Sequence, residues 1–389
     1  MRSITLPRPL TRLVRVCLVP LLLVSVAAGQ EPGATEPVAA EPGSIRVQAT
    51  TPPQGGQVRL LLFDTPATFG RFSQPARVET FPADGRSSFE MLDVPPGTYA
   101  FVLHHDEDSN GEFDKNFIGI PRDPIAISRG YRPKGPPVFA SAGFTLQPGE
   151  QRVTKLELFR VLGRNGLFGV GLGGIGRSSP YAGGDNGVFQ PLPAITYNGS
   201  RLQWFGPSLR YGLIGTDELR LAATASYRLR AYEEDDSTAL DGLGDRKDTL
   251  MAGLAVISEL PAAVNLALGY EHDVLDRIGG GAAQLRASRS FQWGSARFSP
   301  KLGLNWTSSS LANHDFGVAS KAAAPGRPAY DVDDYLSLEA GMGVAVELSR
   351  DWSLNLDLGV EFLPDEVTGS PIVEDDQVLK GFVSLSYIF

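Results

Sequence analysis

A short acidic segment has residue types and spacing typical of a cation-binding loop. Gly111 stands at relative position 6 of this segment, and oxygen-bearing side chains alternate around it at positions 1, 3, 5 and 9. These four residues are Asp106, Asp108, Asn110 and Asp114. Alternate oxygen ligands and a glycine that permits a sharp turn match the first half of an EF-hand calcium loop. Position 12 is Phe117, so the bidentate carboxylate that completes an EF-hand is missing.

The same segment also fits an ordinary turn between two strands. Asp and Asn side chains hydrogen-bond the backbone two residues on, and glycine readily adopts a left-handed conformation. An Asx-rich turn with a left-handed Gly111 is therefore the alternative to a calcium site. His104 and His105 precede the segment on an expected strand, where adjacent side chains point to opposite faces. That geometry disfavours a zinc site built from this histidine pair.

The N-terminus has the pattern of an exported protein. Arginines precede an apolar run at 16–28, which is followed by small residues and is shorter than the ~20 residues of a membrane-spanning helix. We expect a signal peptide at 1–29 and a flexible Pro/Glu/Ala-rich leader at 30–43. Cys17 is the only cysteine and precedes the apolar run, so no disulfide is expected. The net charge of −9 argues against nucleic acid as a partner.

Residues 44–160 predict a small β-domain. Short β-type runs alternate there with turn signals such as Pro-Pro-Gly at 95–97 and Pro-Gly at 148–149. This spacing is typical of an antiparallel β-sandwich of the immunoglobulin or transthyretin kind. Residues 161–166 form the expected linker to a second domain at 167–389. The sequence thus predicts an all-β protein of two domains.

Residues 167–389 have the period-two pattern of membrane-spanning strands. Apolar residues alternate with polar or small ones over about ten positions, for example at 219–230, 336–348 and 353–362. Such segments cross a bilayer with one face toward lipid and the other toward a lumen. Tight connections near 260–261, 293–294 and 350–351 alternate with long polar ones at 231–248, 309–333 and 364–378. We count about eleven candidate strands, and bacterial barrels have an even number, so ten and twelve both remain open.

Charged residues occur on the face of these strands that should line the lumen. They are Arg220, Arg228, Arg230, Arg297, Lys301, Glu271, Glu339, Glu347, Asp357 and Glu361. An ion-pair network, a conducting pore and an acid–base pair are all consistent with them. The chain has no Gly-x-Ser-x-Gly elbow, His-Glu-x-x-His helix or phosphate loop. We therefore expect no enzyme, and no cofactor apart from the candidate calcium ion.

The C-terminal strand ends in Ser-Tyr-Ile-Phe. Tyr387 and the terminal Phe389 resemble the signal that the barrel-assembly machinery reads in outer-membrane proteins, and the terminal ring should lie at the periplasmic rim. Acidic clusters in the long loops fit either solvated loops or divalent cations shared with lipopolysaccharide phosphates.

Several short motifs of the C-terminal domain match a known family in order and spacing. The most specific are carried by Pro180, Tyr181, Gly183, Asp185, Ser370 and Pro371. On these motifs the region 165–389 resembles the MipA/OmpV family of outer-membrane proteins; Gly184 departs from the serine common in the family. The resemblance implies an outer-membrane location. One member is a partner of a lytic transglycosylase and of a bifunctional murein synthase, and others are treated as adhesins or osmotically regulated porins.

The N-terminal domain resembles a second family, of small exported bacterial domains of unknown function. The match rests on Pro96-Gly97-Thr98-Tyr99, on the run 105–111, and on Gly119-Ile120-Pro121. Together the two resemblances predict a cell-envelope scaffold with a periplasmic domain; a small porin or an adhesin is the alternative. The expected partners are membrane lipid, lipopolysaccharide, the barrel-assembly machinery and proteins of murein synthesis or hydrolysis.

Overall fold

The computed structural model describes residues 41–116, 119–163, 166–184, 187–216 and 218–389. The predicted signal peptide, the leader up to residue 40, Asp185 and Phe117 lie outside these described residues. Within the ranges above, no helix is both long and apolar enough to cross a membrane.

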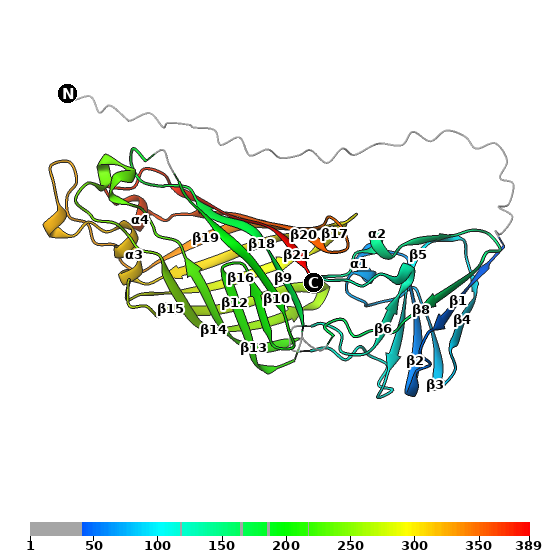
Figure 1. Cartoon of the computed structure of the whole chain (residues 1–389). Coiled ribbons are helices and arrows are strands. Elements are labelled where there is room, and N and C mark those ends of the chain that lie inside the picture. The colour runs from blue at the N-terminus through cyan, green and yellow to red at the C-terminus, as the bar shows by residue number, and fades with distance from the viewer. Residues whose placement is uncertain (1–40, 117–118, 164–165, 185–186, 217) are drawn as a thin grey trace, which may run out of the picture. The chain divides into compact units, whose positions relative to one another are not determined.

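Eight strands make up the N-terminal part of the fold (Figure 1). They are β1 (Gly43–Ala49), β2 (Gln54–Phe63), β3 (Arg77–Asp84), β4 (Ser88–Val94), β5 (Gly97–Asp106), β6 (Ile125–Ile127), β7 (Phe144–Leu146) and β8 (Gln151–Leu156). One sheet has the order β4-β1-β8, and the other has the order β3-β2-β5-β6 with β7 paired to β5. Short helices α1 (Pro66–Phe69) and α2 (Phe139–Ala142) lie between strands.

Alternating apolar residues of both sheets form the core of this part. Ile45, Phe89 and Leu103 are fully buried in one cluster, and Phe63 and Phe69 are fully buried in a second. The expectation of a wholly antiparallel sandwich is wrong at one pair, because β1 and β8 run parallel. A parallel pair needs a long crossover between its strands, and here nearly the whole domain separates β1 from β8.

Twelve antiparallel strands of the described C-terminal residues close into a barrel (Figure 1). They are β9 (Leu167–Arg177), β10 (Val188–Asn198), β11 (Leu202–Phe205), β12 (Ser208–Gly215), β13 (Leu219–Arg228), β14 (Thr249–Leu260), β15 (Val264–Asp273), β16 (Gly281–Arg289), β18 (Ala296–Thr307), β19 (Tyr335–Glu347), β20 (Trp352–Phe362) and β21 (Gln377–Ile388). Pairing of β16 with β18 closes the ring, and β17 (Phe291–Trp293) is a short hairpin partner of β18. Of the two counts left open by the sequence, twelve is therefore correct. Residues 151–156 form β8 of the N-terminal part and pair with β1, so they do not add a strand to the barrel.

The barrel has an apolar outside and a polar inside, as the alternation predicts. Leu302 and Leu338 are 68% and 62% exposed on the outer surface. Glu339 and Glu361, which face each other across β19 and β20, are each only 8% exposed. An apolar outer face of this kind is typical of a barrel surrounded by membrane lipid, because exposed leucine side chains are unfavourable in water.

Short turns gather at one end of the barrel and long connections at the other. The turns after β14 and β19 are short, whereas the connections after β13, β18 and β20 are long and carry short helices, among them α3 (Ser309–Phe316) and α4 (Asp365–Thr368). We call these two ends the turn end and the loop end. The start of β9 pairs with the last residues of β21, so the chain enters the barrel and leaves it at the turn end.

Candidate functional site

The long connections fold together into a compact apolar core at the loop end, which we call the loop cap. Its buried residues come from four connections and the adjoining strand ends. They are Tyr181, Ala231, Tyr232, Leu240, Ala312, Phe316, Val318, Val332, Tyr335, Leu363, Val367, Ile372 and Val378. Tyr181 contacts the rings of both Tyr232 and Phe316, at centroid distances of 4.9 and 6.0 Å. Loops packed in this way form a fixed structure across the barrel end.

Hydrogen bonds from the family-motif residues join the loops of the cap. The Tyr181 hydroxyl donates to the carbonyl oxygen of Asp315 at 3.1 Å. The Ser370 hydroxyl donates to the carbonyl oxygen of Phe316 at 2.6 Å. The structure thus brings together motif residues nearly two hundred positions apart in the chain, and places them in the interior of the cap.

The backbone beside these two is shaped by Pro180, Gly183 and Pro371. Gly183 has a φ of 64°, a left-handed conformation that favours glycine, and its N–H donates to Glu374 at 3.1 Å. The carbonyl oxygen of Pro180 accepts from the Glu374 backbone at 2.8 Å, and Pro371 connects Ser370 to the buried Ile372. These motif residues therefore hold the first and last long connections against each other.

One ion pair lies under the cap. The Arg228 guanidinium, at the loop end of β13, contacts the carboxylate of Asp315 in α3 at 2.5 Å. Burial by itself would raise the pKa of Asp315, but Arg228 and His314 hold that pKa well below its ordinary range. Burial raises the pKa of Tyr232 to about 12 and that of Tyr181 well above its usual value, so both phenols stay neutral.

Several of the charged residues predicted for the lumen form ion pairs with residues of other barrel strands. Lys301 contacts Asp357 and lies 3.9 Å from Glu339, while Lys380 contacts Glu361 at 2.5 Å. On another part of the inner wall, the Glu271 carboxylate accepts a hydrogen bond from Ser226 at 2.5 Å. The ammonium groups of Lys301 and Lys380 each bridge a carboxylate of β19 and one of β20. The arrangement supports a rigid lumen.

Aromatic residues cluster at the turn end, where the first and last barrel strands meet. Tyr387 packs against Trp352 and Phe389, with ring centroids 5.4 and 5.1 Å apart. The N–H of Phe389 donates to the carbonyl oxygen of Phe168 at 2.8 Å. Aromatic belts of this kind lie at the membrane interface. The role of Tyr387 and Phe389 as an assembly signal stays a prediction.

The acidic segment after β5 is hydrogen-bonded as an Asx-rich turn. Asp106 accepts from the N–H of Gly111 at 2.8 Å and from the side chain of Gln57 at 2.7 Å. The Asn110 amide donates to Asp108 at 3.0 Å and to Asp114 at 3.3 Å. Gly111 has a φ of 80°, the left-handed conformation expected for it. In the described ranges no group of three or more His, Cys, Asp or Glu residues could hold a metal ion.

His104 and His105 point to opposite faces of β5, as expected. The ring of His104 is fully buried, lies 2.9 Å from the Asp123 carboxylate and stacks on Phe113 with a centroid distance of 4.1 Å. Burial lowers the pKa of His104, while Asp123 partly opposes that shift. His105 instead contacts the carbonyl oxygen of Gly55 at 2.7 Å. A neutral His104 paired with Asp123 is a structural element of this core.

Calcium binding by the Asp106–Asp114 loop can be tested by melting the full-length protein. An ion that binds only the folded state stabilises it by RT ln(1 + [L]/Kd), about 2.7 kcal/mol at a hundredfold excess over Kd. If calcium binds, the transition of the N-terminal sheets should occur at higher temperature in millimolar calcium than in chelator. Asp108→Ala should abolish that shift, and Glu112→Ala should keep it. Equal melting temperatures of the wild type in calcium and in chelator would show that the segment is a hydrogen-bonded turn that does not bind calcium.

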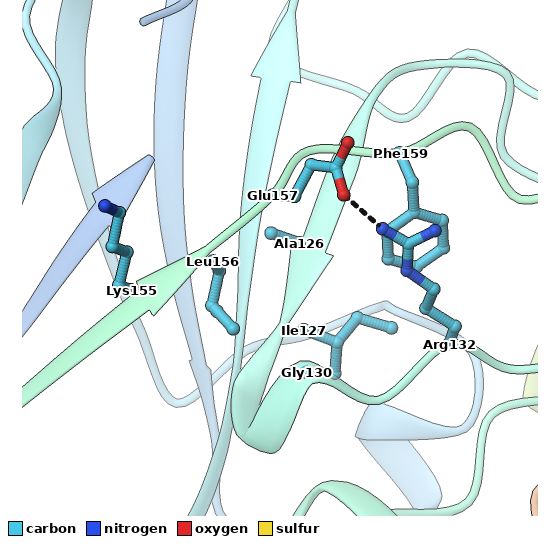
Figure 2. A pocket seen from close by; sticks show the side chains of 8 residues that line it. All are labelled: Ala126, Ile127, Gly130, Arg132, Lys155, Leu156, Glu157 and Phe159. Atoms are coloured by element: carbon cyan, nitrogen blue, oxygen red, sulfur yellow. Dashed lines mark hydrogen bonds and ion pairs between the residues drawn. The ribbon is translucent and has the colours of Figure 1, made fainter. Parts of the chain in front are cut away.

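A shallow pocket of about 210 Å³ lies in the N-terminal part (Figure 2). It is lined by Ala126, Ile127, Gly130, Arg132, Lys155, Leu156, Glu157 and Phe159. The Arg132 guanidinium is paired with Glu157 at 2.8 Å and lies 4.8 Å from the ring centre of Phe159. Figure 2 shows Lys155 directed away from these side chains. The charged groups of Arg132 and Glu157 in this pocket are therefore paired with each other.

The sequence patterns do not predict the loop cap. The long connections are polar in overall composition, but Tyr232 and Phe316 within them are almost fully buried. Large aromatic residues inside otherwise polar loops were the available signal, because they are rarely left in water in such numbers.

A closed strand ring with an apolar outer face, an aromatic rim and packed loops defines a β-barrel of the bacterial outer membrane. A family model described as MltA-interacting protein MipA matches residues 170–389, more than half of the chain. The chain belongs to this family. A second model, described as an uncharacterized protein conserved in bacteria (DUF2141), matches residues 46–154. Both resemblances inferred from the sequence are confirmed.

Curated relatives match the barrel. The MltA-interacting protein of Escherichia coli K12 is 28% identical over 222 residues, which cover 56% of this chain and 88% of the relative. The putative outer membrane protein YiaT of the same strain is 25% identical over 228 residues, covering 57% and 90%. Outer membrane protein OmpV of Vibrio cholerae is 26% identical over 167 residues, covering 41% and 62%. The chain is thus an outer-membrane protein, and these relatives are outer-membrane proteins, not members of an enzyme family.

Solved structures with a similar arrangement are outer-membrane barrels. The NanC porin is 10% identical with a TM-score of 0.29, and covers 56% of this chain and 98% of its own. The COG4313 channel of Pseudomonas putida F1 is 13% identical with a TM-score of 0.32, covering 57% and 95%.

Proposed function

We propose that this chain is an envelope scaffold whose barrel anchors it in the outer membrane and whose N-terminal sheets bind a periplasmic partner. Proteins of murein synthesis or hydrolysis are the proposed partner class. The barrel's similarity to a protein whose name records interaction with MltA supports this class. The N-terminal sheets are an addition to that family's barrel, so the partner surface is proposed for this chain's own domain.

The loop cap is the observation that carries the proposal. Its buried aromatic and aliphatic residues fill the loop end, and the Arg228–Asp315 ion pair lies beneath them. Below the cap, Lys301 and Lys380 bridge carboxylates of β19 and β20. A barrel closed by packed side chains at one end and cross-linked by ion pairs inside suits an anchor better than an open channel.

The place where the chain enters the barrel supports a periplasmic position for the N-terminal sheets. Short turns of outer-membrane barrels face the periplasm. Since β9 begins beside the end of β21 at the turn end, the preceding domain emerges on that side. The outer face of the β4-β1-β8 sheet leaves Leu92 and Val153 each 55% exposed, which provides apolar surface for a partner.

A small porin is the second candidate function. The observation in its favour is the polar inner wall, with Gln284, Asn305 and Glu339 hydrogen-bonded side by side. In this alternative the loops would have to open for ions to enter. Conductance measurements therefore separate the two functions.

We expect the wild-type protein to show no ion conductance in planar bilayers, because the loop cap closes the loop end. A variant in which 309–333 is replaced by a short Gly/Ser linker should conduct, since it lacks α3 and much of the cap. This variant is the control showing that a conducting barrel would be detected. Steady conductance of the wild type equal to that of the variant would favour the porin.

Photo-crosslinking in intact envelopes tests the partner surface. A photoreactive residue at Val153 should form adducts with murein-synthesis or murein-hydrolysis proteins, which mass spectrometry can identify. The same residue at the exposed Thr80, on β3 of the other sheet, is the matched control. Equal yields at the two positions, or adducts without any murein protein, would contradict the proposed surface.

A further inference from the structure

The strand β8 forms one edge of an N-terminal sheet. It is the last strand in the order β4-β1-β8 and pairs with β1 alone, in parallel and without a break over 151–156. The carbonyl oxygens of Glu150 and Leu156 accept from the N–H groups of β1 and of the residue after it, at 2.9 and 2.8 Å. Backbone direction alternates along a strand, so the odd-numbered residues of β8 point their N–H and C=O groups away from β1. We call residues 151–156, with these outward backbone groups, the β8 edge.

Two pockets lie one after the other along the β8 edge. The pocket of about 210 Å³ described above includes residues 155–157 (Figure 2). A second pocket, of about 230 Å³, includes residues 152–154 together with Phe101, Ser128, Arg129 and Phe144 from the strands and connections of the other sheet. Side chains of a strand added beside β8 would alternate between the two faces of the sheet, so one set of them would face these pockets.

The side chains beside the β8 edge carry uncompensated positive charge. Four cationic residues line the two pockets: Arg129, Arg132, Arg152 and Lys155. Two of these arginines are paired, one with Glu157 at 2.8 Å and the other with Glu150 at 3.4 Å. The Arg129 guanidinium donates only to carbonyl oxygens, and Lys155 makes no ion pair or hydrogen bond with any described residue. An anionic partner would therefore be attracted to this edge.

The same charges disfavour a second copy of this chain as the occupant. Two β8 edges paired with each other would bring Arg152 and Lys155 of both copies together, and like charges on adjacent strands are destabilising. Natural sheet edges carry lysine for this reason. A strand that carries carboxylates would instead gain ion pairs in addition to its backbone hydrogen bonds.

We propose that the β8 edge binds an extended acidic segment of a periplasmic protein by strand addition. Backbone pairing with the odd-numbered residues of β8 supplies affinity, and the pockets and cations select the side chains of the segment. Val153 belongs both to this edge and to the exposed face proposed above as the partner surface, so the two are continuous. The inference rests on the proposed function, because it names the edge and the segment chemistry by which the N-terminal sheets would hold their partner.

Peptide binding to the full-length protein in detergent micelles tests the edge. The probe is a fluorescent peptide in which valine and glutamate alternate, and the control peptide has lysine in place of glutamate. We expect only the glutamate peptide to bind. Val153→Pro should weaken its binding about tenfold, because proline removes an outward N–H and leaves the pairing with β1 in place. Val153→Ala keeps that N–H and should bind as the wild type does.

Hydrogen exchange resolved to single residues separates strand addition from simple charge attraction. The amides of Val153 and Lys155 should exchange fast in the free protein and slowly when the glutamate peptide is bound. Those of Arg152 and Thr154, which are bonded to β1, should exchange slowly in both states. A glutamate peptide methylated on its backbone nitrogens should give no added protection, a result that does not depend on whether any variant folds. Slow exchange of β1 in each variant shows that its sheets are folded.

Charge variants provide a second readout. Lys155→Gln should weaken binding of the glutamate peptide several-fold, whereas Arg86→Gln, at the turn between β3 and β4, should not. Equal binding of the two peptides, or binding without added protection at Val153 and Lys155, would overturn the proposal. Protection that appears without peptide as the protein concentration rises would assign the edge to a second copy instead. Binding only after deletion of 31–40 would assign it to the chain's own leader.

Photo-crosslinking from Leu92 in intact envelopes separates this inference from the scaffold function. Leu92 lies on the exposed face of the same sheet but outside the β8 edge. If the segment binds at the edge, Val153→Pro should reduce the adducts of Leu92 with murein-synthesis or murein-hydrolysis proteins. Adducts unchanged by Val153→Pro would overturn strand addition and leave the scaffold function standing. Absence of murein proteins from the adducts of the wild type would contradict the scaffold function itself.

Discussion

Replacing Asp315 with alanine should destabilise the loop cap by about 1–3 kcal/mol, because the Arg228 guanidinium, whose side chain is only 31% exposed, would lose its ionic partner. The Asp315 carboxylate lies almost fully buried in α3. We therefore expect the variant's loops to be cut by protease at concentrations that leave the wild type intact. Ion conductance should appear in bilayers at the same time, since the cap closes the loop end.

The matched control is Asp331→Ala in the same connection. Asp331 is exposed, so this variant loses the same charge without taking the ionic partner from Arg228. This variant should keep the protease resistance of the wild type and, like the wild type, should show no ion conductance. If both variants opened equally, the total charge of the loop would be the cause, and the Arg228–Asp315 pair would have no special role.

The Arg228–Asp315 pair also sets the lowest pH at which the loop cap keeps its stabilisation. The pKa of Asp315 is lower in the folded protein than in the unfolded chain, where it is about 3.9. The stabilisation is therefore present above pH 4 and is lost only as the pH falls through the lower folded value. Protease resistance of the wild-type loops should persist well below pH 4.

Gly171→Ala should prevent the barrel from closing. A Cβ at this position would overlap the carbonyl oxygen of Leu385 in β21, at the seam where the first and last barrel strands pair. A backbone atom cannot rotate away as a side chain can, so the cost should exceed the roughly 1–3 kcal/mol typical of overpacking. We expect the variant to lose the resistance to unheated SDS that folded barrels show on gels.

Gly343→Ala is the control for this substitution. A Cβ on Gly343, in β19, would lie 3.6 Å from its nearest neighbours, which is ordinary contact. This variant should fold and run on gels as the wild type does. A folded Gly171→Ala barrel would show that the seam can widen to admit a methyl group.

Strand alternation and loop lengths determined the barrel from the sequence alone. A period of two is a local property, so runs such as 336–348 and 353–362 reveal one lipid face and one lumen face without any partner strand. Turn lengths are also local, and they placed the long connections at one end. The C-terminal motifs are also local in the sequence, so their match predicted the family without knowledge of the fold.

Local patterns were weaker in the N-terminal sheets. The charges and Pro82 of the edge strand β3 resemble a loop, although a sheet edge tolerates both. The run 138–146 has the composition of a single strand, but its first half is the helix α2. The parallel pairing of β1 with β8 depends on residues at opposite ends of the domain, so no local signal could predict it.

Only the tertiary structure decided the strand number and the loop cap. Twelve strands follow from the pairing of β16 with β18, which is a non-local closure. The cap joins Tyr181, Phe316 and Ser370 across nearly two hundred residues, each in a loop with no periodicity of its own. Pro191 and Pro193 lie in the part of β10 that pairs with β9 but not with β11, and this follows only from the register of these strands. Each of these features is set by which segments meet in space, and period and composition do not encode that.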